Sequence, residues 1–255
     1  MSEEQKSSTK RKRSTFGVVF LIIFLDMVGF SVIFPLFPDM LDYYLERESE
    51  GGILKSFVAS IEGMSFNADE STNQSFRFET VIFGGVLGSL YAVLQFFFAP
   101  IWGRLSDKYG RRPILLMTVG GTCLGYGLWV FAGSFWVLVL SRVVGGIASG
   151  NLSVATASIA DVTSRESRSK GMALVGVAFG LGFILGPALG GLASLVEPLG
   201  GDSQGAFVLN KFSLAAIISL ALGALNWFWL AKRFKETLPA ERRAEVNSPK
   251  PGIFK

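Results

Sequence analysis

Long uncharged and mostly apolar stretches recur along the chain and determine its class. Four of them contain no Asp, Glu, Lys or Arg, and these cover residues 80–103, 113–141, 171–196 and 212–231. An apolar run of about 18 or more residues is long enough to cross the ~30 Å hydrocarbon core of a membrane as an α-helix. A soluble core has no need for four such runs, so the pattern predicts an integral membrane protein.

Residual charges and turn signals divide the apolar sequence into six predicted helical spans. They cover residues 16–41, 80–101, 113–132, 135–160, 170–194 and 207–231. The third and fourth are separated only by Gly133-Ser134, a short turn that makes them antiparallel neighbours. The predicted fold class is therefore an all-α membrane protein, with a six-helix bundle over 16–231, a basic arm over 1–15 and a tail over 232–255.

The Lys and Arg residues are distributed unevenly between the two ends of this bundle. Most of the 24 fall in the arm, in the second-to-third and fourth-to-fifth connections, and in the tail. The long first connection, 42–79, is instead rich in Asp and Glu. Because cytoplasmic loops carry the excess of Lys and Arg, both termini are expected in the cytoplasm and 42–79 is expected to be a flexible external loop. The basic arm is interpreted as a topology anchor that favours anionic lipid, and not as a nucleic-acid-binding tail.

The composition excludes several kinds of catalytic and metal site. The chain has no histidine and one cysteine, Cys123, which lies within an apolar run. A Cys/His metal site, a Ser-His-Asp triad, a Cys-His pair and an internal disulfide are therefore ruled out. No enzymatic activity, metal or cofactor is expected, and Cys123 is interpreted as a small packing residue. Any group that handles protons has to be a carboxylate, because no imidazole is present.

Two charges lie deep inside the predicted spans, away from the span ends, Asp26 in the first and Arg142 in the fourth. Counted from the ends of their spans, Asp26 lies ~15 Å from the cytoplasmic edge and Arg142 ~10 Å from the outer edge. Their depths in a ~30 Å core differ by only ~5 Å. A charge near the membrane centre costs at least ~2.5–3.5 kcal/mol, so each side chain is expected to face the bundle interior, with a partner or water.

The segment 103–115, between the second and third spans, reads GRLSDKYGRRPIL. Gly103 and Gly110 allow a tight turn, and Pro113 suits the first turn of the following helix. Asp107 is expected close to that helix N-terminus, where a carboxylate is favoured. A simple basic topology loop would explain the arginines, but not the two glycines and the aspartate at these offsets.

This segment resembles the signature loop of the major facilitator superfamily, in which glycine, leucine, aspartate and basic residues recur at the same offsets. The resemblance implies the N-terminal half of a twelve-helix secondary transporter, built from two inverted three-helix repeats. It also implies a cytoplasmic charge network that holds the outward-open state. The loop positions that carry this resemblance are Gly103, Arg104, Asp107, Lys108, Gly110, Arg111 and Arg112.

The fifth span contains GFILGPALGG at 182–191. Gly182, Gly186 and Gly190 share one helix face and let another helix backbone approach closely, as any seam of small residues does. Pro187 removes a backbone donor and promotes a kink. The ending through Gly190-Gly191 also resembles the fifth-helix motif of proton-coupled drug antiporters, which favours export over uptake.

Two further segments carry the same resemblance. The first span reads LDMVGF at 25–30 and PLFP at 35–38, and is similar to the first helix of tetracycline/proton antiporters; the fourth reads RVVGG at 142–146 and resembles a fourth-helix motif with an intramembrane arginine. Gly145 departs from that motif, where glutamine is more common. We hypothesise that Asp26 and Arg142 face a shared central cavity, with Asp26 carrying a proton or cation and Arg142 alternating between Asp26 and substrate. A static ion pair is the alternative.

Polar residues near these positions are candidates for the substrate cavity, or equally for interhelical hydrogen bonds of ~0.6 kcal/mol each. They are Gln95, Asn151, Ser153 and Thr156.

The leading functional hypothesis is a proton-driven exporter of small organic molecules or drugs, without a cofactor, in a bacterial inner membrane or a plasma membrane. The alternatives are half of a sugar or metabolite uptake symporter and a membrane scaffold or receptor that does not transport. The segment KETLPAERR, 235–243, resembles the start of the cytoplasmic linker that joins the two six-helix halves of drug antiporters, and the sequence ends at Lys255. A second six-helix half is therefore expected in cis, as a separate chain or through self-association, with protons, substrate and lipid as the other partners and no nucleic acid.

Overall fold

The computed structural model describes residues 3–49, 51–64, 78–196 and 205–247. The regular secondary structure of this part is helical, apart from an isolated bridge between Ala132 and Phe207. It contains six helical stretches that are long and apolar enough to cross a membrane, which confirms the predicted all-α six-helix fold. They are Phe16–Arg47, Glu79–Tyr109, Arg111–Val130, Phe135–Val162, Ser167–Ser194 and Ser213–Arg233.

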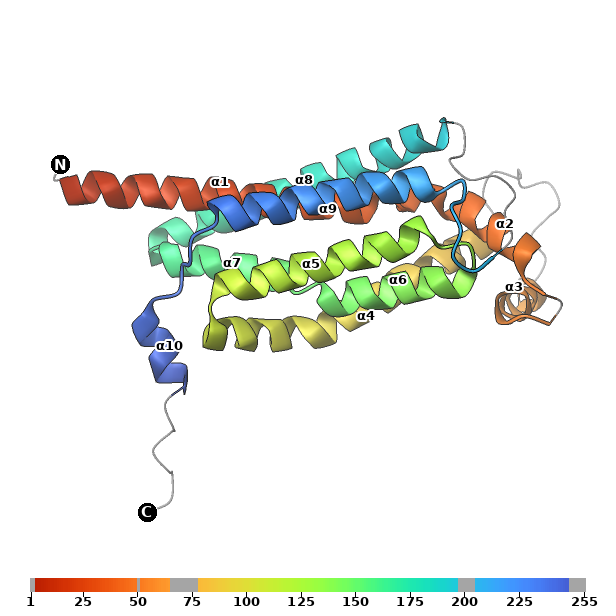
Figure 1. Ribbon diagram of the computed structural model, residues 1–255, viewed down its shortest axis with the longest axis horizontal. Coiled ribbons are helices and arrows are strands. Elements are labelled where there is room, and N and C mark those ends of the chain that lie inside the picture. Colours follow the sequence, from red (N-terminus) through yellow and green to blue (C-terminus); the bar gives the residue numbers. More distant parts are fainter. Residues whose placement is uncertain (1–2, 50, 65–77, 197–204, 248–255) are drawn as a thin grey trace, which may run out of the picture.

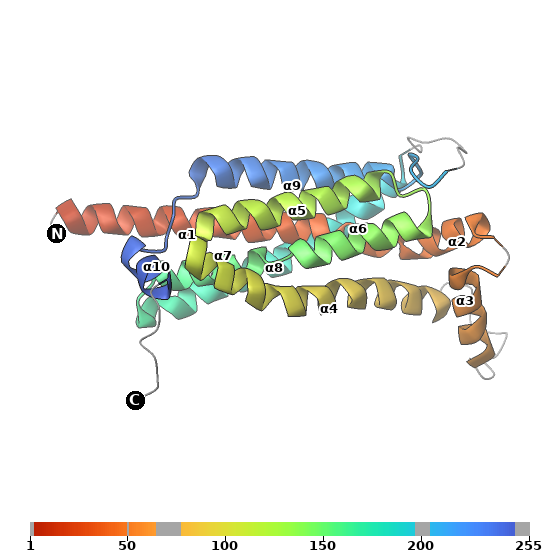
Figure 2. The ribbon, with the colours of Figure 1, turned by 60° about the horizontal axis from the view of Figure 1, so that its bottom comes forward.

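The helices are numbered in chain order, and several spans consist of more than one. The elements are α1 (Glu3–Ser31), η1 (Phe34–Leu36), α2 (Phe37–Arg47), α3 (Ile53–Met64), α4 (Phe78–Tyr109), α5 (Arg111–Val130), α6 (Phe135–Ala148), α7 (Asn151–Val162), α8 (Arg165–Ser194), α9 (Ser213–Arg233) and α10 (Ala240–Asn247). In the bundle α1 packs against α8 and α9, while α5 packs against α6 and α9 (Figures 1 and 2).

The two ends of the bundle are formed by different segments of the chain. The N-terminus of α1, the α4–α5 turn and α10 lie at one end, and α2 and α3 lie at the other (Figure 1). The segments that hold most of the basic residues therefore gather at a single end, as the charge distribution predicts.

The first and fourth spans are each interrupted near the middle, whereas the sequence pattern predicted continuous helices. In the first, α1 ends at Ser31 and a 3-10 turn with Pro35 precedes α2, which has Pro38 in its first turn. In the fourth, α6 ends at Ala148 and α7 begins at Asn151. A side chain at the intervening Gly150 would collide with the ring of Trp102, so glycine allows α4 to approach the break.

The glycine face of the fifth span packs directly on α1. A β-carbon added at Gly182 would lie 2.5 Å from Cβ of Met27, and one at Gly190 would collide with the carbonyl oxygen of Val32. The Ser31 hydroxyl donates to the Gly182 carbonyl oxygen at 3.1 Å. Because these glycines have no side chains, the backbones of α1 and α8 come into contact along this seam. The helix α8 continues through Pro187 without ending.

Two predictions about the connections were wrong in part. The 42–79 segment was expected to be a flexible loop, but α2 extends to Arg47 and α3 occupies Ile53–Met64, with its first N–H groups bound by the Glu48 carboxylate. Residues 65–77 lie outside the described part. Gly103 was expected in a tight turn, but α4 runs through it to Tyr109 and only Gly110 forms the turn, with φ 108°.

The α1–α8 contact can be tested with two glycines of the same helix. Gly190→Ala places a methyl group against the Val32 carbonyl, and overpacking of this kind is expected to cost about 1–3 kcal/mol. Gly180→Ala meets no heavy atom within 4 Å, so it should leave stability unchanged or raise it through helix propensity. Thermal unfolding in detergent, followed by helical circular dichroism, compares the two. Equal midpoints would show that the seam does not limit stability.

Candidate functional site

Asp26 lies in α1 with 8% of its surface exposed. It lines a small hollow together with Asn151, Ile22, Ile23 and Leu152. Asn151 is the first residue of α7, directly after the break in the fourth span. Its side-chain amide is buried and interacts with the Asp26 carboxylate. The carboxylate of one span therefore faces the interrupted backbone of another.

Arg142 lies in α6 with 4% of its surface exposed. Its Nε and one terminal nitrogen each donate to the Ser141 hydroxyl at 3.3 Å, and its guanidinium lies 5.0 Å from the ring centre of Trp129. It lines a different hollow from Asp26, and the two side chains form no ion pair in the described structure. This conformation therefore does not contain the static Asp26–Arg142 ion pair that was the alternative.

Two tyrosines reach toward the helices that carry these charges. The Tyr126 hydroxyl would lie 3.3 Å from a β-carbon at Gly29, one turn beyond Asp26, and the Tyr91 ring would lie 3.1 Å from one at Gly145. Both rings are buried, and both are near enough to interact electrostatically with Asp26 and with Arg142. The two glycines thus make room for aromatic rings between the charged helices.

The predicted cavity polars separate into two places. Gln95, Ser153 and Thr156 line an open groove of about 780 Å³ between α4, α7 and α8, whose apolar lining includes Phe96 and Phe179. The Gln95 amide donates to the Ser149 carbonyl at 3.4 Å, within the break of the fourth span. Asn151 lies instead beside Asp26. This volume falls within the range of small-molecule sites.

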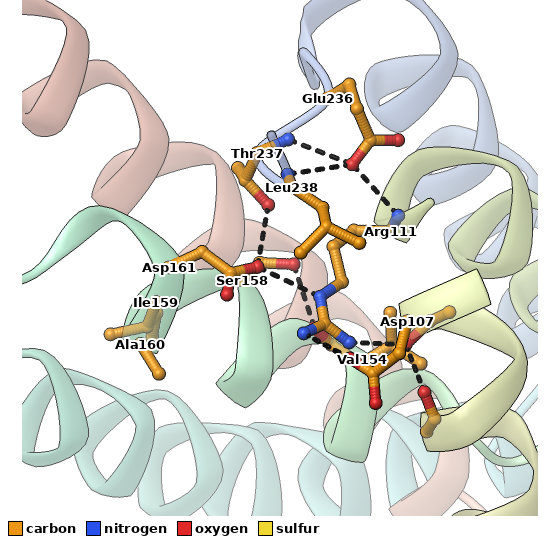
Figure 3. A network of polar contacts seen from close by, with 12 residues as sticks. Asp107, Arg111, Val154, Ser158, Ile159, Ala160, Asp161, Glu236, Thr237 and Leu238 are labelled. Carbon is orange, nitrogen blue, oxygen red and sulfur yellow. Dashed lines mark hydrogen bonds and ion pairs between the residues drawn. The ribbon is translucent and has the colours of Figure 1, made fainter. Parts of the chain in front are cut away.

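A buried arginine organises the basic end of the bundle (Figure 3). Arg111, at the start of α5, is almost fully buried, and its Nε lies 2.9 Å from the Asp161 carboxylate of α7. Its other nitrogens contact the Asp107 carboxylate at 2.8 Å and the Ser106 hydroxyl at 2.6 Å, both from α4. One guanidinium therefore joins the ends of three helices.

The segment after α9 closes the same network. One oxygen of the Glu236 carboxylate accepts the Arg111 N–H at 2.9 Å and the other accepts the Arg112 N–H at 3.1 Å, so Glu236 caps α5 from more than 100 residues away. The Thr237 hydroxyl donates to Asp161 at 3.4 Å. A side chain at Gly110 would lie 2.5 Å from Glu236, so glycine is required here for space as well as for its positive φ.

Some members of this network were predicted and others were missed. Asp107 and Arg111 are brought together as an ion pair, and Arg112 donates to the Ala231 carbonyl at 2.7 Å. Arg104 is exposed and makes none of these contacts, while Lys108 lies over the ring of its neighbour Tyr109. The missed members are Ser106, Asp161, Glu236 and Thr237. Asp161 carried a signal, because it is an acid directly after an apolar span.

The described residues contain no group of three or more His, Cys, Asp or Glu side chains arranged to bind a metal ion.

The two carboxylates that flank Arg111 differ in burial and should differ in energetic weight. The Asp161 side chain is 6% exposed and the Asp107 side chain 46%. Asp161→Asn, which weakens a buried charge-assisted contact, is expected to lower the free energy of unfolding by about 1.5–3 kcal/mol. Asp107→Asn is expected to cost no more than about 1 kcal/mol. Thermal unfolding of the two variants in the same detergent measures the difference, and a larger loss for Asp107→Asn would contradict this ranking.

Comparison with known proteins agrees with this architecture. The sequence profile described as "Major Facilitator Superfamily" matches residues 19–254. The chain is 37% identical over 239 residues to human "Major facilitator superfamily domain-containing protein 10", covering 91% of this chain and 47% of that protein. It is 33% identical over 237 residues to "Tetracycline resistance protein, class B" of Escherichia coli, covering 92% of this chain and 49% of that protein.

Among solved structures, the chain is similar to the "Crystal structure of the human organic anion transporter MFSD10 (TETRAN)". The TM-score is 0.75 at 34% identity, and the match covers 91% of this chain and 50% of that one. The chain thus spans about half the length of the relatives it matches. The chain therefore belongs to the major facilitator superfamily, a family of membrane transporters rather than of enzymes.

Proposed function

We propose that this chain is the N-terminal half of a secondary transporter that exports small organic molecules in exchange for protons. The observation that carries the proposal is the placement of Asp26, a carboxylate buried in the middle of an apolar span and facing the interrupted backbone of another. An ionisable residue inside a membrane span is by default a functional group, because its cost is otherwise unexplained. The names of two relatives, a tetracycline resistance protein and an organic anion transporter, support export of organic molecules.

Protonation of Asp26 gives a physical route from a proton gradient to a conformational change. An ionised carboxylate is costly in a closed hollow of low dielectric, whereas the protonated form is neutral. The ionised form therefore favours a conformation in which water reaches α1, and the protonated form tolerates one in which the hollow is closed. The neighbouring break between α6 and α7 provides a hinge at which such a change can occur.

We place the substrate in the open groove, between this chain and a second half. Gln95, Ser153 and Thr156 provide polar groups on a largely apolar wall, but that wall is exposed in this chain. The neighbouring surface carries large exposed apolar side chains such as Phe96 and Ile184. A second six-helix half, in cis, as a separate chain or as a second copy, would enclose the groove and complete the site.

The gating role of the signature loop is part of the same proposal. Asp107 and Arg111 tie α4 to α5, and Asp161 and Glu236 extend that tie to α7 and the linker. Opening the bundle at this end would break several of these contacts together, so the network favours the conformation closed at this end. With the basic residues gathered there, we place this end and both termini in the cytoplasm.

The proton-carrier role of Asp26 is tested with the purified chain in proteoliposomes, alone and together with a second half where one is available. A pH-sensitive dye inside the vesicles reports proton movement when tetracycline is added against an imposed pH gradient. Asp26→Asn cannot release a proton and is expected to abolish substrate-driven proton flux. Asp39→Asn, an exposed carboxylate of α2 in the same span, is the matched control and should retain it.

The outcomes separate the competing functions. Full proton-coupled transport by Asp26→Asn would remove the carrier role. Flux of substrate and protons in the same direction would indicate a symporter instead of an exporter. Absence of flux in every combination, with the helical fold intact, would favour a scaffold or receptor.

The orientation is tested by cysteine labelling in a Cys123→Ser background. Arg104→Cys is near the end of α4, and Lys235→Cys lies between α9 and α10, both at the basic end of the bundle, whereas Ser56→Cys lies in α3 at the other end. In intact cells, a membrane-impermeant maleimide is expected to label Ser56→Cys and to label the other two only after the membrane is permeabilised. Labelling of Arg104→Cys in intact cells would reverse the proposed topology.

A further inference from the structure

The surroundings of Arg142 contain hydrogen-bond donors and no carboxylate among the described residues. The Ser141 hydroxyl, at 3.3 Å, is the acceptor that its guanidinium reaches. Trp129, against whose ring the guanidinium lies, has a buried Nε1–H without an acceptor in the described structure. A cation at this depth is costly, and neutral hydroxyls offset little of that cost. The site is therefore positively charged and short of an anion.

The other residues of the hollow are neutral and mostly hydroxyl-bearing. Tyr91, Thr122, Tyr126 and Ser141 line it together with Arg142, and Gly125 and Gly145 complete the wall. Hydroxyl groups can donate to an oxyanion, and arginine presents a planar set of donors that matches a carboxylate or sulfonate in two contacts. The set of side chains therefore fits an anionic head group and offers little to a cation.

The carboxylate inside the first span does not supply this anion. Asp26 lines a separate hollow, and Tyr91 and Tyr126 reach toward α1 and α6 from α4 and α5. Among the described residues that line this hollow, Arg142 is therefore the charged one, and the others are neutral. The two buried charges can act on different species, a proton at Asp26 and an anion at Arg142.

We propose that the hollow around Arg142 is a subsite for the carboxylate or sulfonate head of the transported molecule. This inference rests on the proposed transport function and specifies its substrate class as amphipathic organic anions. Tyr91 lines the hollow and Gln95, one turn along α4 and thus ~6 Å away, lines the open groove. A head group at Arg142 thereby places an apolar body toward the groove wall that carries Phe96 and Phe179. The hollow has no free space for a water molecule, so the head group enters only when neighbouring helices separate.

The subsite can be tested by binding, without a pH gradient or transport. The probes are 2-naphthalenesulfonate and its uncharged sulfonamide, which share one apolar body. The purified full chain is titrated with each, and its thermal unfolding midpoint is recorded. The sulfonate is expected to raise the midpoint in a saturable way, and the sulfonamide is expected to have at least about tenfold weaker effect, the loss of one charged hydrogen-bonded contact.

Substitutions assign the effect to this arginine. Arg142→Gln should abolish the preference for the sulfonate, and Arg142→Lys should weaken it because the paired donors are lost. Tyr126→Phe removes a lining hydroxyl while keeping the ring, so it should weaken sulfonate binding even where Arg142→Gln does not fold. Arg233→Gln is the matched control, because Arg233 also lies over a tryptophan, at 5.5 Å from the Trp229 ring, but on the exposed surface.

The inference is overturned if both probes act equally on the unsubstituted chain. It is also overturned if Arg142→Gln and Tyr126→Phe bind the sulfonate as Arg233→Gln does. Asp26→Asn separates this inference from the proposed function, because it should lose proton flux while still binding the sulfonate. Proton-coupled transport without a preference for the anionic probe would leave the transport proposal intact and remove the subsite.

Discussion

The close contact between α1 and α8 is the interaction on which the rest of the bundle depends. In a membrane, apolar side chains gain nothing by leaving lipid for one another, so helices associate through close packing and internal hydrogen bonds. Gly182 and Gly190 provide that packing, and the Ser31 hydroxyl adds a hydrogen bond to the Gly182 carbonyl. The seam covers the end of α1 that follows Asp26. The carboxylate itself lines the hollow that it shares with Asn151 of α7.

The ends of α5 are completed by side chains from distant segments of the chain. At one end of α5, Glu236 accepts the first backbone N–H groups. At the other, the Ala132 carbonyl beyond α5 accepts from the Tyr44 hydroxyl and the Asn210 amide, and the Ser213 hydroxyl donates to the Val130 carbonyl. Helix ends leave backbone groups unpaired, and here side chains from distant segments pair them. Contacts that stabilise α5 are thus also the contacts that connect it to α2, α9 and the linker.

Features that depend on neighbouring residues could be predicted from the sequence, whereas contacts between residues far apart in the chain could not. Charge-free runs reveal the spans because crossing a membrane is a local requirement, and Asp26 and Arg142 are conspicuous because charges in such runs are rare. The signature segment identifies Arg111, but its partners Asp161 and Glu236 lie 50 and 125 residues away, and no local pattern joins them. The breaks were missed although both carry breakers, since the hydrophobic pattern continues across them.

The break in the fourth span lies between the surroundings of the two buried charges. Asn151 follows the α6–α7 break and lines the hollow of Asp26, while Gln95 donates to the Ser149 carbonyl within that break. A change at the break therefore alters the surroundings of Asp26 and the wall of the groove together. Arg142, two turns before the break on α6, moves with the part of the span that the break separates from α7. Under the proposed function, proton binding and substrate binding would affect one another through a single interrupted helix, without direct contact between the two charges.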